Sequence, residues 1–496
     1  MTRLLLTLTI LITSFVSAAD RPNMIFIIAD DVSWNDLGCY GNTAVRTPNL
    51  DKLAANGRRF DEAYLTASSC SPSRSSIITG RYPHNNGRAS ELHQPIAAHL
   101  PWFPRLLKDA GYYTALVGKH HMTADKPAEG EKPQPEPFDL VDSGNVPGNK
   151  GGHATWVKTV QERPKDKPFF FWFASLDAHR AWDADKDWKE DLYGPMHDPA
   201  KVIVPPFQVD DAETRQDLAS YYNEITRLDY FVGQVVAELE KQGALDNTLL
   251  LMMADNGRAF PRAKTRLHDS GMKTPFIAHW PAGIGKPGTP SQSLVSAIDV
   301  APTMLDLAQV DIAPTMQGVS FAPILAQPEA EVRKHVFSEH NWHDYAAHGR
   351  SVRSEGFLLI RNNRPQEPWQ GPADSVRSPS YEQLKAARAA GNLTLAQGDV
   401  FLAPRPAMEL YRTAADADQM SKLDDNPDYA TIKIRLTKLL DEWTEQTGDS
   451  VPADLSKDCF DRETGNQLYK GRDQSYRGTP AGWDRDAAHI NAPGPR

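Results

Sequence analysis

The sequence is poor in three features: cysteine, long apolar runs and excess positive charge. Its three cysteines, Cys39, Cys70 and Cys459, are too few for a disulfide framework, and spacing alone does not decide whether Cys39 and Cys459 pair. No stretch after the N-terminal segment is apolar for long enough to span a membrane. The formal net charge of -10 disfavours a protein built to wrap nucleic acid. We therefore expect neither a disulfide-stapled module, nor a membrane-spanning protein, nor a nucleic-acid binder.

Residues 1–19 have the organisation of a secretory signal. Arg3 supplies the positive start, residues 4–16 form the apolar stretch, and residues 16–19 provide the small side chains of a cleavage site. The mature protein is therefore predicted to be exported to the periplasm or the extracellular space, or to a lysosome in a eukaryote.

The rest of the chain alternates strand and helix patterns, which is typical of α/β proteins. Apolar runs predict strands at residues 23–29, 113–117, 168–174, 247–253 and 274–280. Apolar residues at three- and four-residue spacing predict a long helix at 211–242, with shorter helices at 47–57, 103–110 and 299–307, the last capped by Asp299. This order predicts a large, mostly parallel sheet flanked by helices on both faces.

The pattern changes near residue 335, which suggests a division into domains. Residues 20–334 are predicted to form the large domain, and residues 335–455 a smaller C-terminal α/β subdomain with strands at 335–339 and 357–361 and a helix at 429–443. Residues 456–496 are rich in Gly, Pro, Asp and Arg, so we predict a tail that is extended or only locally ordered.

Cys70 lies where a short helix should begin. The serines around it can cap the helix, Pro72 suits its first turn, and Gly80 can end it. A helix N-terminus favours an anion or a developing negative charge, and Arg74 lies one turn further on. A buried structural cysteine is the ordinary alternative, because most free cysteines are small core residues.

Two acidic pairs follow predicted buried strands. Asp30-Asp31 comes after the first strand, and Asp255-Asn256 after the strand at 247–253. Ligands gather outside the carboxyl ends of parallel strands, so these oxygen donors would suit Ca²⁺ or Mg²⁺ rather than zinc. Each pair alone is equally explained by turn chemistry, since Asp and Asn favour such positions.

The Cys-x-Pro-Ser-Arg motif at residues 70–74, followed by Thr-Gly-Arg at 79–81, resembles the signature of the type I sulfatases. The resemblance implies an alkaline-phosphatase-like fold. It also implies that a formylglycine-generating or other sulfatase-maturing enzyme oxidises Cys70 to formylglycine, whose hydrate is the nucleophile. The implied metal ligands, usually around Ca²⁺ with Mg²⁺ as the alternative, are Asp30, Asp31, Asp255, Asn256 and the modified residue 70.

A shell of cations and histidines is also similar to the family's pattern. Lys119 and His121 resemble its Lys-x-His pair, Lys264 its second active-site lysine, and His179 its histidine at the leaving-group oxygen, although Ala181 stands where many members have proline. Fixed cations around one sulfur would stabilise the transition state, which is the part expected of Arg74, Lys119 and Lys264. We expect His121 and His179 to have pKa values near neutrality and to transfer protons.

Within the family the chain looks closest to the heparan N-sulfatase (sulfamidase) branch, with one departure. Lys264 stands where that branch carries arginine. A sulfated saccharide is the expected substrate, with Arg180, His340 and His343 as candidates for contacting it, beside Trp342 as a surface for the sugar ring. Two alternatives stay open: a phosphoester or phosphonate hydrolase of the alkaline-phosphatase superfamily, and an inactive secreted saccharide-binding homologue. The sequence gives no indication of the oligomeric state.

Overall fold

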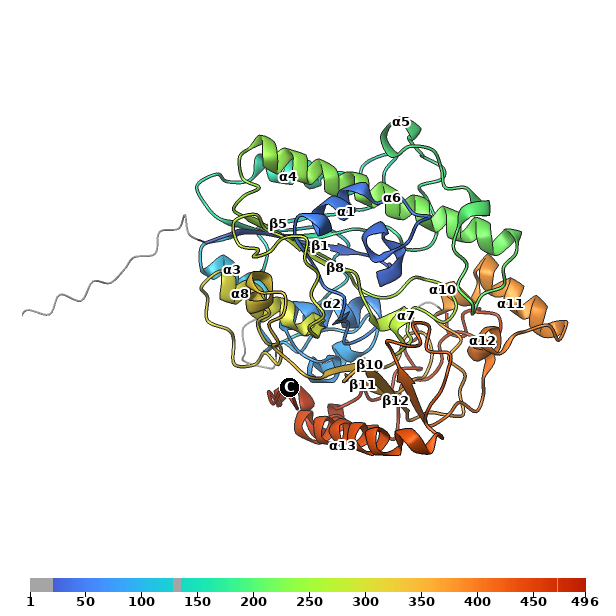
Figure 1. Cartoon of the computed structure of the whole chain (residues 1–496). Helices are drawn as coiled ribbons and strands as arrows, with labels where there is room; N and C mark the ends of the chain where they lie inside the picture. The colour runs from blue at the N-terminus through green and yellow to red at the C-terminus, as the bar shows by residue number, and fades with distance from the viewer. Residues whose placement is uncertain (1–20, 128–134, 471) are drawn as a thin grey trace, which may run out of the picture.

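The computed structural model describes residues 21–127, 135–470 and 472–496. The predicted signal segment lies outside these residues. Figure 1 shows one large sheet crossed by long helices and a second, smaller sheet beside it that is formed by the C-terminal part of the chain. Within the described residues, no helix is both long and apolar enough to cross a membrane.

The large sheet has seven strands in the order β2-β8-β7-β1-β6-β4-β5. Parallel pairing joins β1 to β6 and β7, and β4 to β5 and β6, as predicted for the centre of the sheet. Strand β8, which lies between β7 and the edge strand β2, differs because it runs antiparallel to both of them. The strands are β1 (Asn23–Ala29), β2 (Arg58–Arg59), β4 (Tyr113–Gly118), β5 (Leu140–Asp142), β6 (Phe169–Ala174), β7 (Thr248–Ala254) and β8 (Phe276–His279).

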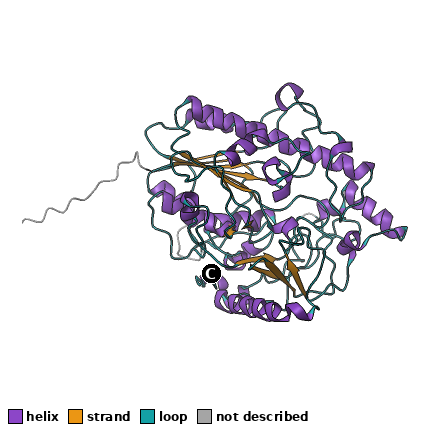
Figure 2. Cartoon of the chain, viewed as in Figure 1, coloured by secondary structure: helices purple, strands orange, loops and turns teal. Residues whose placement is uncertain are grey.

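Strand β1 illustrates why an unbroken apolar run becomes a central strand. Met24, Phe26 and Ile28 face one hydrophobic core, while Ile25 and Ile27 face another. Both faces of the strand are buried away from water, so side chains that point to either face must be apolar. The sheet is therefore the middle layer of a three-layer sandwich, which Figure 2 shows as strands between two groups of helices.

The helices cover the two faces in separate groups. Apolar residues of α2, α3 and α8 pack on one face, and those of α1, α4 and α6 on the other. The helices are α1 (Pro48–Ala55), α2 (Cys70–Thr79), α3 (Phe103–Asp109), α4 (Trp156–Glu162), α5 (Glu190–Tyr193), α6 (Ala212–Lys241), α7 (Asp269–Met272), α8 (Val300–Leu307), α9 (Ala322–Ala326), α10 (Ala373–Val376), α11 (Pro379–Ala389), α12 (Leu395–Gly398) and α13 (Ala430–Thr447).

The helix ends follow the sequence pattern with one exception. Asp211 caps α6 by accepting a hydrogen bond from the Thr214 amide at 2.9 Å. Asp299, predicted to cap α8, makes no such bond to that helix. Its carboxylate instead accepts from the Ser296 amide at 2.8 Å and pairs with Arg333, because a buried arginine nearby requires a charged partner.

The C-terminal part forms a four-stranded antiparallel sheet in the order β10-β11-β12-β13. One face joins the core of the large domain through Leu358 and Ile360, and the other is covered by Leu436, Leu440 and Trp443 of α13. The strands are β10 (Val336–His340), β11 (Gly349–Ser354), β12 (Phe357–Asn362) and β13 (Met408–Arg412). A two-stranded parallel sheet pairs β3 (Ala63–Tyr64) with β9 (Val295–Ser296).

The tail from residue 456 has little regular structure but is packed against the rest of the protein. Its described part contains two short 3₁₀ helices, Trp483–Arg485 and Ala487–His489. Trp342 donates from its indole nitrogen to the Lys457 carbonyl at 2.7 Å, and Arg81 donates to the Ile490 carbonyl at 2.9 Å. The low apolar content therefore did not prevent order, because polar side chains of the two domains bind the tail's backbone.

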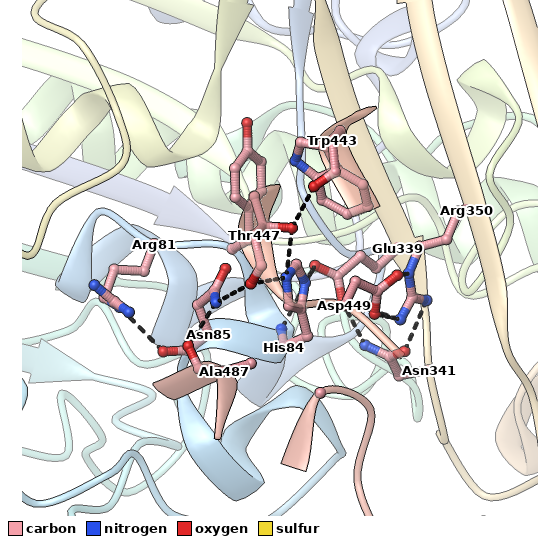
Figure 3. Close-up of polar contacts among 12 residues, drawn as sticks. Arg81, His84, Asn85, Glu339, Asn341, Arg350, Trp443, Thr447, Asp449 and Ala487 are labelled. Carbon is pink, nitrogen blue, oxygen red and sulfur yellow. Dashed lines mark hydrogen bonds and ion pairs between the residues drawn. The ribbon is translucent and has the colours of Figure 1, made fainter. Parts of the chain in front are cut away.

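A buried polar network joins the two domains (Figure 3). His84, just after α2, contacts the Glu339 carboxylate of β10 at 2.7 Å and the Thr447 hydroxyl of α13 at 3.0 Å. Arg350 of β11 forms a two-point ion pair with Asp449 at 2.6 and 2.7 Å. We call His84, Glu339, Asn341, Arg350, Thr447 and Asp449 the interdomain network.

Candidate active site

Helix α2 begins at Cys70 and ends at Gly80, as predicted, and Gly80 adopts the left-handed conformation with φ of 66°. Ser69 and Ser71, which flank Cys70 and are predicted to cap the helix, bond other segments of the protein instead. The Ser69 hydroxyl bonds the His343 ring at 2.7 Å, and the Ser71 hydroxyl accepts from the His93 amide at 2.8 Å. Ser69 makes no side-chain cap to the helix. Both hydroxyls therefore tie distant segments to the start of α2.

Cys70 is buried, with only 3% of its surface exposed. Burial raises the pKa of its thiol to about 12, although Lys119 and Lys264 lie close enough to oppose the shift. A thiol with such a pKa is protonated at neutral pH and is a poor nucleophile. The setting fits a residue that needs chemical conversion before it can attack a substrate.

The two acidic pairs meet at one edge of the large sheet. Strands β1 and β7 are paired in register up to Ala29 and Ala254, so the residues that follow them lie side by side. A carboxylate oxygen of Asp30, one of Asp255 and the Cys70 sulfur all lie within 4.8 Å of one another. Asn256 donates to the Asp31 carboxylate at 2.5 Å, which brings the second member of each pair into the same cluster.

The chemistry of these donors fits a hard divalent cation. Asp30, Asp31, Asp255 and Asn256 are fully buried, and the amide oxygen of Asn256 has no hydrogen-bond partner within the described residues. Burial and the neighbouring carboxylates raise the pKa of Asp255 to about 6. A buried carbonyl oxygen without a donor, beside crowded carboxylates, is what an oxygen-coordinated ion would satisfy.

Three cations surround the acidic cluster. Arg74 lies 2.8 Å from the Asp255 carboxylate, Lys119 2.5 Å from Asp30, and Lys264 2.8 Å from Asp31. We call these six charged residues the site cluster. Its three positive and three negative charges cancel, so a bound divalent ion would leave an excess of two positive charges facing Cys70. Such an excess favours a doubly charged or strongly polarised oxyanion.

The two histidines predicted to transfer protons differ in their surroundings. His179 is 35% exposed, and its Nε2 lies 3.9 Å from the Asp374 carboxylate. His121 is also half-buried, but burial of its ring together with Lys119 lowers its pKa to about 2. The expectation of a near-neutral pKa is therefore wrong for His121, because the lysine that shares its motif disfavours a second positive charge.

The candidate substrate residues are also placed differently from one another. His343 lies against Ser69, beside the nucleophile position. His340 is 9% exposed and packs edge-on against Trp369 at 5.1 Å. Arg180 forms a two-point ion pair with Asp217, both distances being 2.7 Å, and donates to the Ala259 carbonyl at 2.8 Å. These partners fix the Arg180 guanidinium to α6 and to the loop after β7, and its contact with a substrate stays a prediction.

Two residues that sequence reasoning missed lie at the site. Asp374, at the start of the short helix α10, lies 3.8 Å from Lys264 and faces His179. His93 bonds His121 at 2.7 Å between ring nitrogens. Neither belongs to a motif that sequence reasoning singled out, so only the packing of their loops reveals them.

Comparison with known proteins gives two family matches, which together span residues 22–372. A family described as Sulfatase matches residues 22–310, and one described as N-sulphoglucosamine sulphohydrolase, C-terminal, matches residues 262–372. Human N-sulphoglucosamine sulphohydrolase is 30% identical over 473 residues, which cover 86% of this chain and 91% of that protein. An ulvan-active sulfatase of Formosa agariphila is 28% identical over 485 residues, 87% of this chain and 76% of that protein.

A solved structure shares the fold. It is a complex with its substrate D-glucosamine-2-N,6-O-disulfate, and it matches with a TM-score of 0.61 and 20% identity. The match covers 86% of this chain and 98% of that one. The layered α/β architecture and the second antiparallel sheet are therefore those of known proteins.

Proposed function

Because the chain belongs to the sulfatase family, we propose that it hydrolyses sulfate ester or sulfamate groups of a sulfated saccharide. The observation that carries the proposal is the site cluster. Cys70 begins a helix and lies against three carboxylates and three cations that are buried together at the edge of the sheet. Burying so many charges in one place is costly even when they are paired, which favours a functional reason for the cluster.

Residue 70 and the two acidic pairs are the proposed nucleophile and metal site. We propose that Cys70 is converted to formylglycine by a sulfatase-maturing enzyme, and that Asp30, Asp31, Asp255, Asn256 and residue 70 hold Ca²⁺, with Mg²⁺ as the alternative. The converted residue supplies an oxygen nucleophile, and the ion supplies positive charge at the sulfate oxygens. The unpartnered Asn256 oxygen and the all-oxygen donor set support the metal assignment.

The protein's own side chains position and polarise the sulfate group. Arg74, Lys119 and Lys264 are fixed by their carboxylate partners, so they need little reorganisation as negative charge develops. His179 is the accessible histidine and is placed to protonate the leaving oxygen or nitrogen. His121, which is uncharged at neutral pH, can contribute a hydrogen bond but not a proton.

A saccharide substrate is supported by the relatives and by the rim of the site. Of the relatives named above, one is called N-sulphoglucosamine sulphohydrolase and the other is called an ulvan-active sulfatase. Asp374 and His343 supply a carboxylate and a ring nitrogen next to Lys264 and Cys70, and these groups suit sugar hydroxyl or amino groups. An N-sulfated or O-sulfated hexosamine is the leading candidate, and Lys264 keeps an O-sulfated sugar open.

The predicted export signal would place this activity in the periplasm or outside the cell. Sequencing the N-terminus of the mature protein tests this part, because an exported protein should begin near residue 20. A mature chain that retains residues 1–19 would contradict it.

Two measurements test the function. Mass spectrometry of the peptide containing Cys70 should show a residue lighter than cysteine, because sulfur is replaced by oxygen. Released sulfate should then be measured on N-sulfoglucosamine, on 6-O- and 2-O-sulfated sugars, and on a phosphonate monoester. Turnover of the phosphonate alone would overturn the proposal, and turnover of simple aryl sulfates alone would overturn its saccharide part.

A further inference from the structure

His93 lies beside the nucleophile position, and the proposed function gives it no role. Its ring Nδ1 is 2.7 Å from Nε2 of His121, and its backbone amide donates to the Ser71 hydroxyl at 2.8 Å. Main chain and side chain therefore anchor it to two separate parts of the site. The two histidines come from loops that are 28 positions apart in the sequence.

Both histidines have a backbone conformation that costs energy. His93 has φ of 63° and His121 has φ of 52°, in the left-handed region that residues other than glycine rarely adopt. Such strain persists only where the surroundings hold it, and it is concentrated at functional sites. The pairing of two strained histidines next to Cys70 is therefore unlike a chance surface contact.

The C-terminal tail holds the loop that carries His93. Arg477 donates to the Leu92 carbonyl at 2.9 Å and to the Glu91 carboxylate at 3.1 Å. Its guanidinium lies 3.9 Å from the centre of the Trp342 ring. Ser456 adds a bond to the same Glu91 carboxylate at 2.8 Å. Three hydrogen bonds from a segment more than 350 positions away keep this short loop in place.

The hydrogen-bonding capacity of His121 limits what it can do alone. A neutral imidazole has one donor nitrogen and one acceptor nitrogen. Its Nε2 is engaged by His93, and its Nδ1 is buried without a partner within the described residues. For Nδ1 of neutral His121 to donate a hydrogen bond to an anionic oxygen, Nε2 of the same ring must be the acceptor nitrogen. A hydrogen-bond donor must then face Nε2.

We propose that His93 is a positioning residue that donates from Nδ1 to Nε2 of His121 and so leaves the Nδ1–H of His121 to bind an anionic sulfate oxygen. This inference rests on the proposed sulfatase function. Burial, Lys119 and Arg74, which disfavour a positive charge on His121, support it, since a doubly protonated ring would not need His93. His93 itself does not touch the reacting atoms.

The test compares two replacements of His93 in the full, matured protein. His93→Gly removes the ring but tolerates the positive φ, whereas His93→Asn keeps an amide donor near the Nδ1 position and also accepts this backbone. We expect kcat/KM for the best sulfated sugar to fall about 100-fold in the glycine variant and less than about 5-fold in the asparagine variant. Added imidazole should restore part of the activity of the glycine variant.

His99→Asn is the matched control, because His99 also stacks on a histidine, His489, at a ring separation of 4.2 Å, but away from the site. It should leave kcat/KM unchanged. Equal losses in the glycine and asparagine variants, no imidazole rescue, or an unaffected glycine variant would each overturn the proposal.

A second readout does not depend on turnover. Nitrogen-15 NMR of histidine-labelled protein, with the His121 signals assigned by their loss in His121→Gln, should show Nδ1 protonated and Nε2 unprotonated. The opposite tautomer would overturn the positioning proposal even if the protein is an active sulfatase. The expected tautomer in a protein that releases no sulfate would instead count against the proposed function alone.

Discussion

Two buried groups of charges, the site cluster and the interdomain network, use similar residues for different ends. Both join segments that are far apart in the sequence, and both pair arginine with aspartate at distances under 3 Å. In the interdomain network the polar side-chain atoms of His84, Glu339, Asn341, Arg350 and Asp449 all have partners (Figure 3). In and around the site cluster, the Asn256 oxygen and the His121 Nδ1 have no hydrogen-bond partner among the residues that the structure describes.

This difference separates a structural ion network from a reactive site. A buried polar atom without a partner costs about 1–3 kcal/mol, so a fold keeps it only where something else compensates. Within the described residues the interdomain network is complete without a ligand, and it ties the small sheet and α13 to the segment after α2. The site cluster would be completed by the cation and the anion that we propose for it.

The largest effect is expected from Asp255→Asn in the site cluster. The variant should lose its bound metal and at least about 10³-fold in kcat/KM, because a ligand and a charge are removed together. Metal content by mass spectrometry and sulfate release are the measurements. Asp449→Asn, its counterpart in the interdomain network, should keep both the metal and the activity.

If the Asp449 variant also lost its metal, the separation of the two groups would be wrong. Calcium should raise the melting temperature of the unaltered protein but not of the Asp255 variant, since only a folded state with an intact site binds the ion.

His179→Gln should have the next largest effect, and the effect should depend on the leaving group. A proton donor contributes about 10²-fold when the leaving group is a sugar oxygen or nitrogen, but little for an aryl sulfate. We therefore expect kcat to fall about 100-fold on the sugar and less than about 5-fold on 4-nitrophenyl sulfate. Equal losses on both substrates would argue for a binding role instead.

Arg477→Met should have a smaller effect, acting from the tail. Methionine keeps a long side chain at this position but removes the guanidinium, and with it both the contact over the Trp342 ring and the bonds to the His93 loop. We expect kcat/KM to fall about 10-fold with the metal retained. Arg472→Met, at an exposed position of the same tail, is the control and should change nothing. A loss of metal in the Arg477 variant would mean that the tail supports the whole site rather than one loop.

Glu339→Gln should have the smallest effect on activity and a clear effect on stability. It removes the charge that faces His84 and leaves buried donors partly unsatisfied, so the free energy of unfolding should fall by about 2–4 kcal/mol. The midpoint of urea unfolding measures this, and kcat should stay within about twofold. A large loss of kcat with unchanged stability would place the interdomain network within the catalytic machinery.

The sequence by itself determined the central layer of the fold and the core of the site. Unbroken apolar runs predict strands that are covered on both faces, and the carboxyl ends of such parallel strands meet at one edge, where Asp30 and Asp255 lie. The Cys70 motif and the short motifs that contain Arg74, Lys119 and Lys264 are each local in sequence, so their resemblance to the family's pattern could be read directly. The long helix at 211–242 was also readable, because its periodicity extends over many turns.

Only the tertiary structure decided the rest, because long-range contacts leave no local pattern. The antiparallel pairing of β8 with β2 and of β13 with β12 joins strands that are far apart in the chain. The polar tail is predicted to be extended or only locally ordered, yet the buried side chains of Trp342 and Arg81 hold it against the rest of the protein. Asp374 and His93 reach the site from separate loops, and the low pKa of His121 arises from burial next to Lys119. The pKa of a side chain and the position of a loop are properties of the folded molecule, because both depend on which distant groups pack around the site.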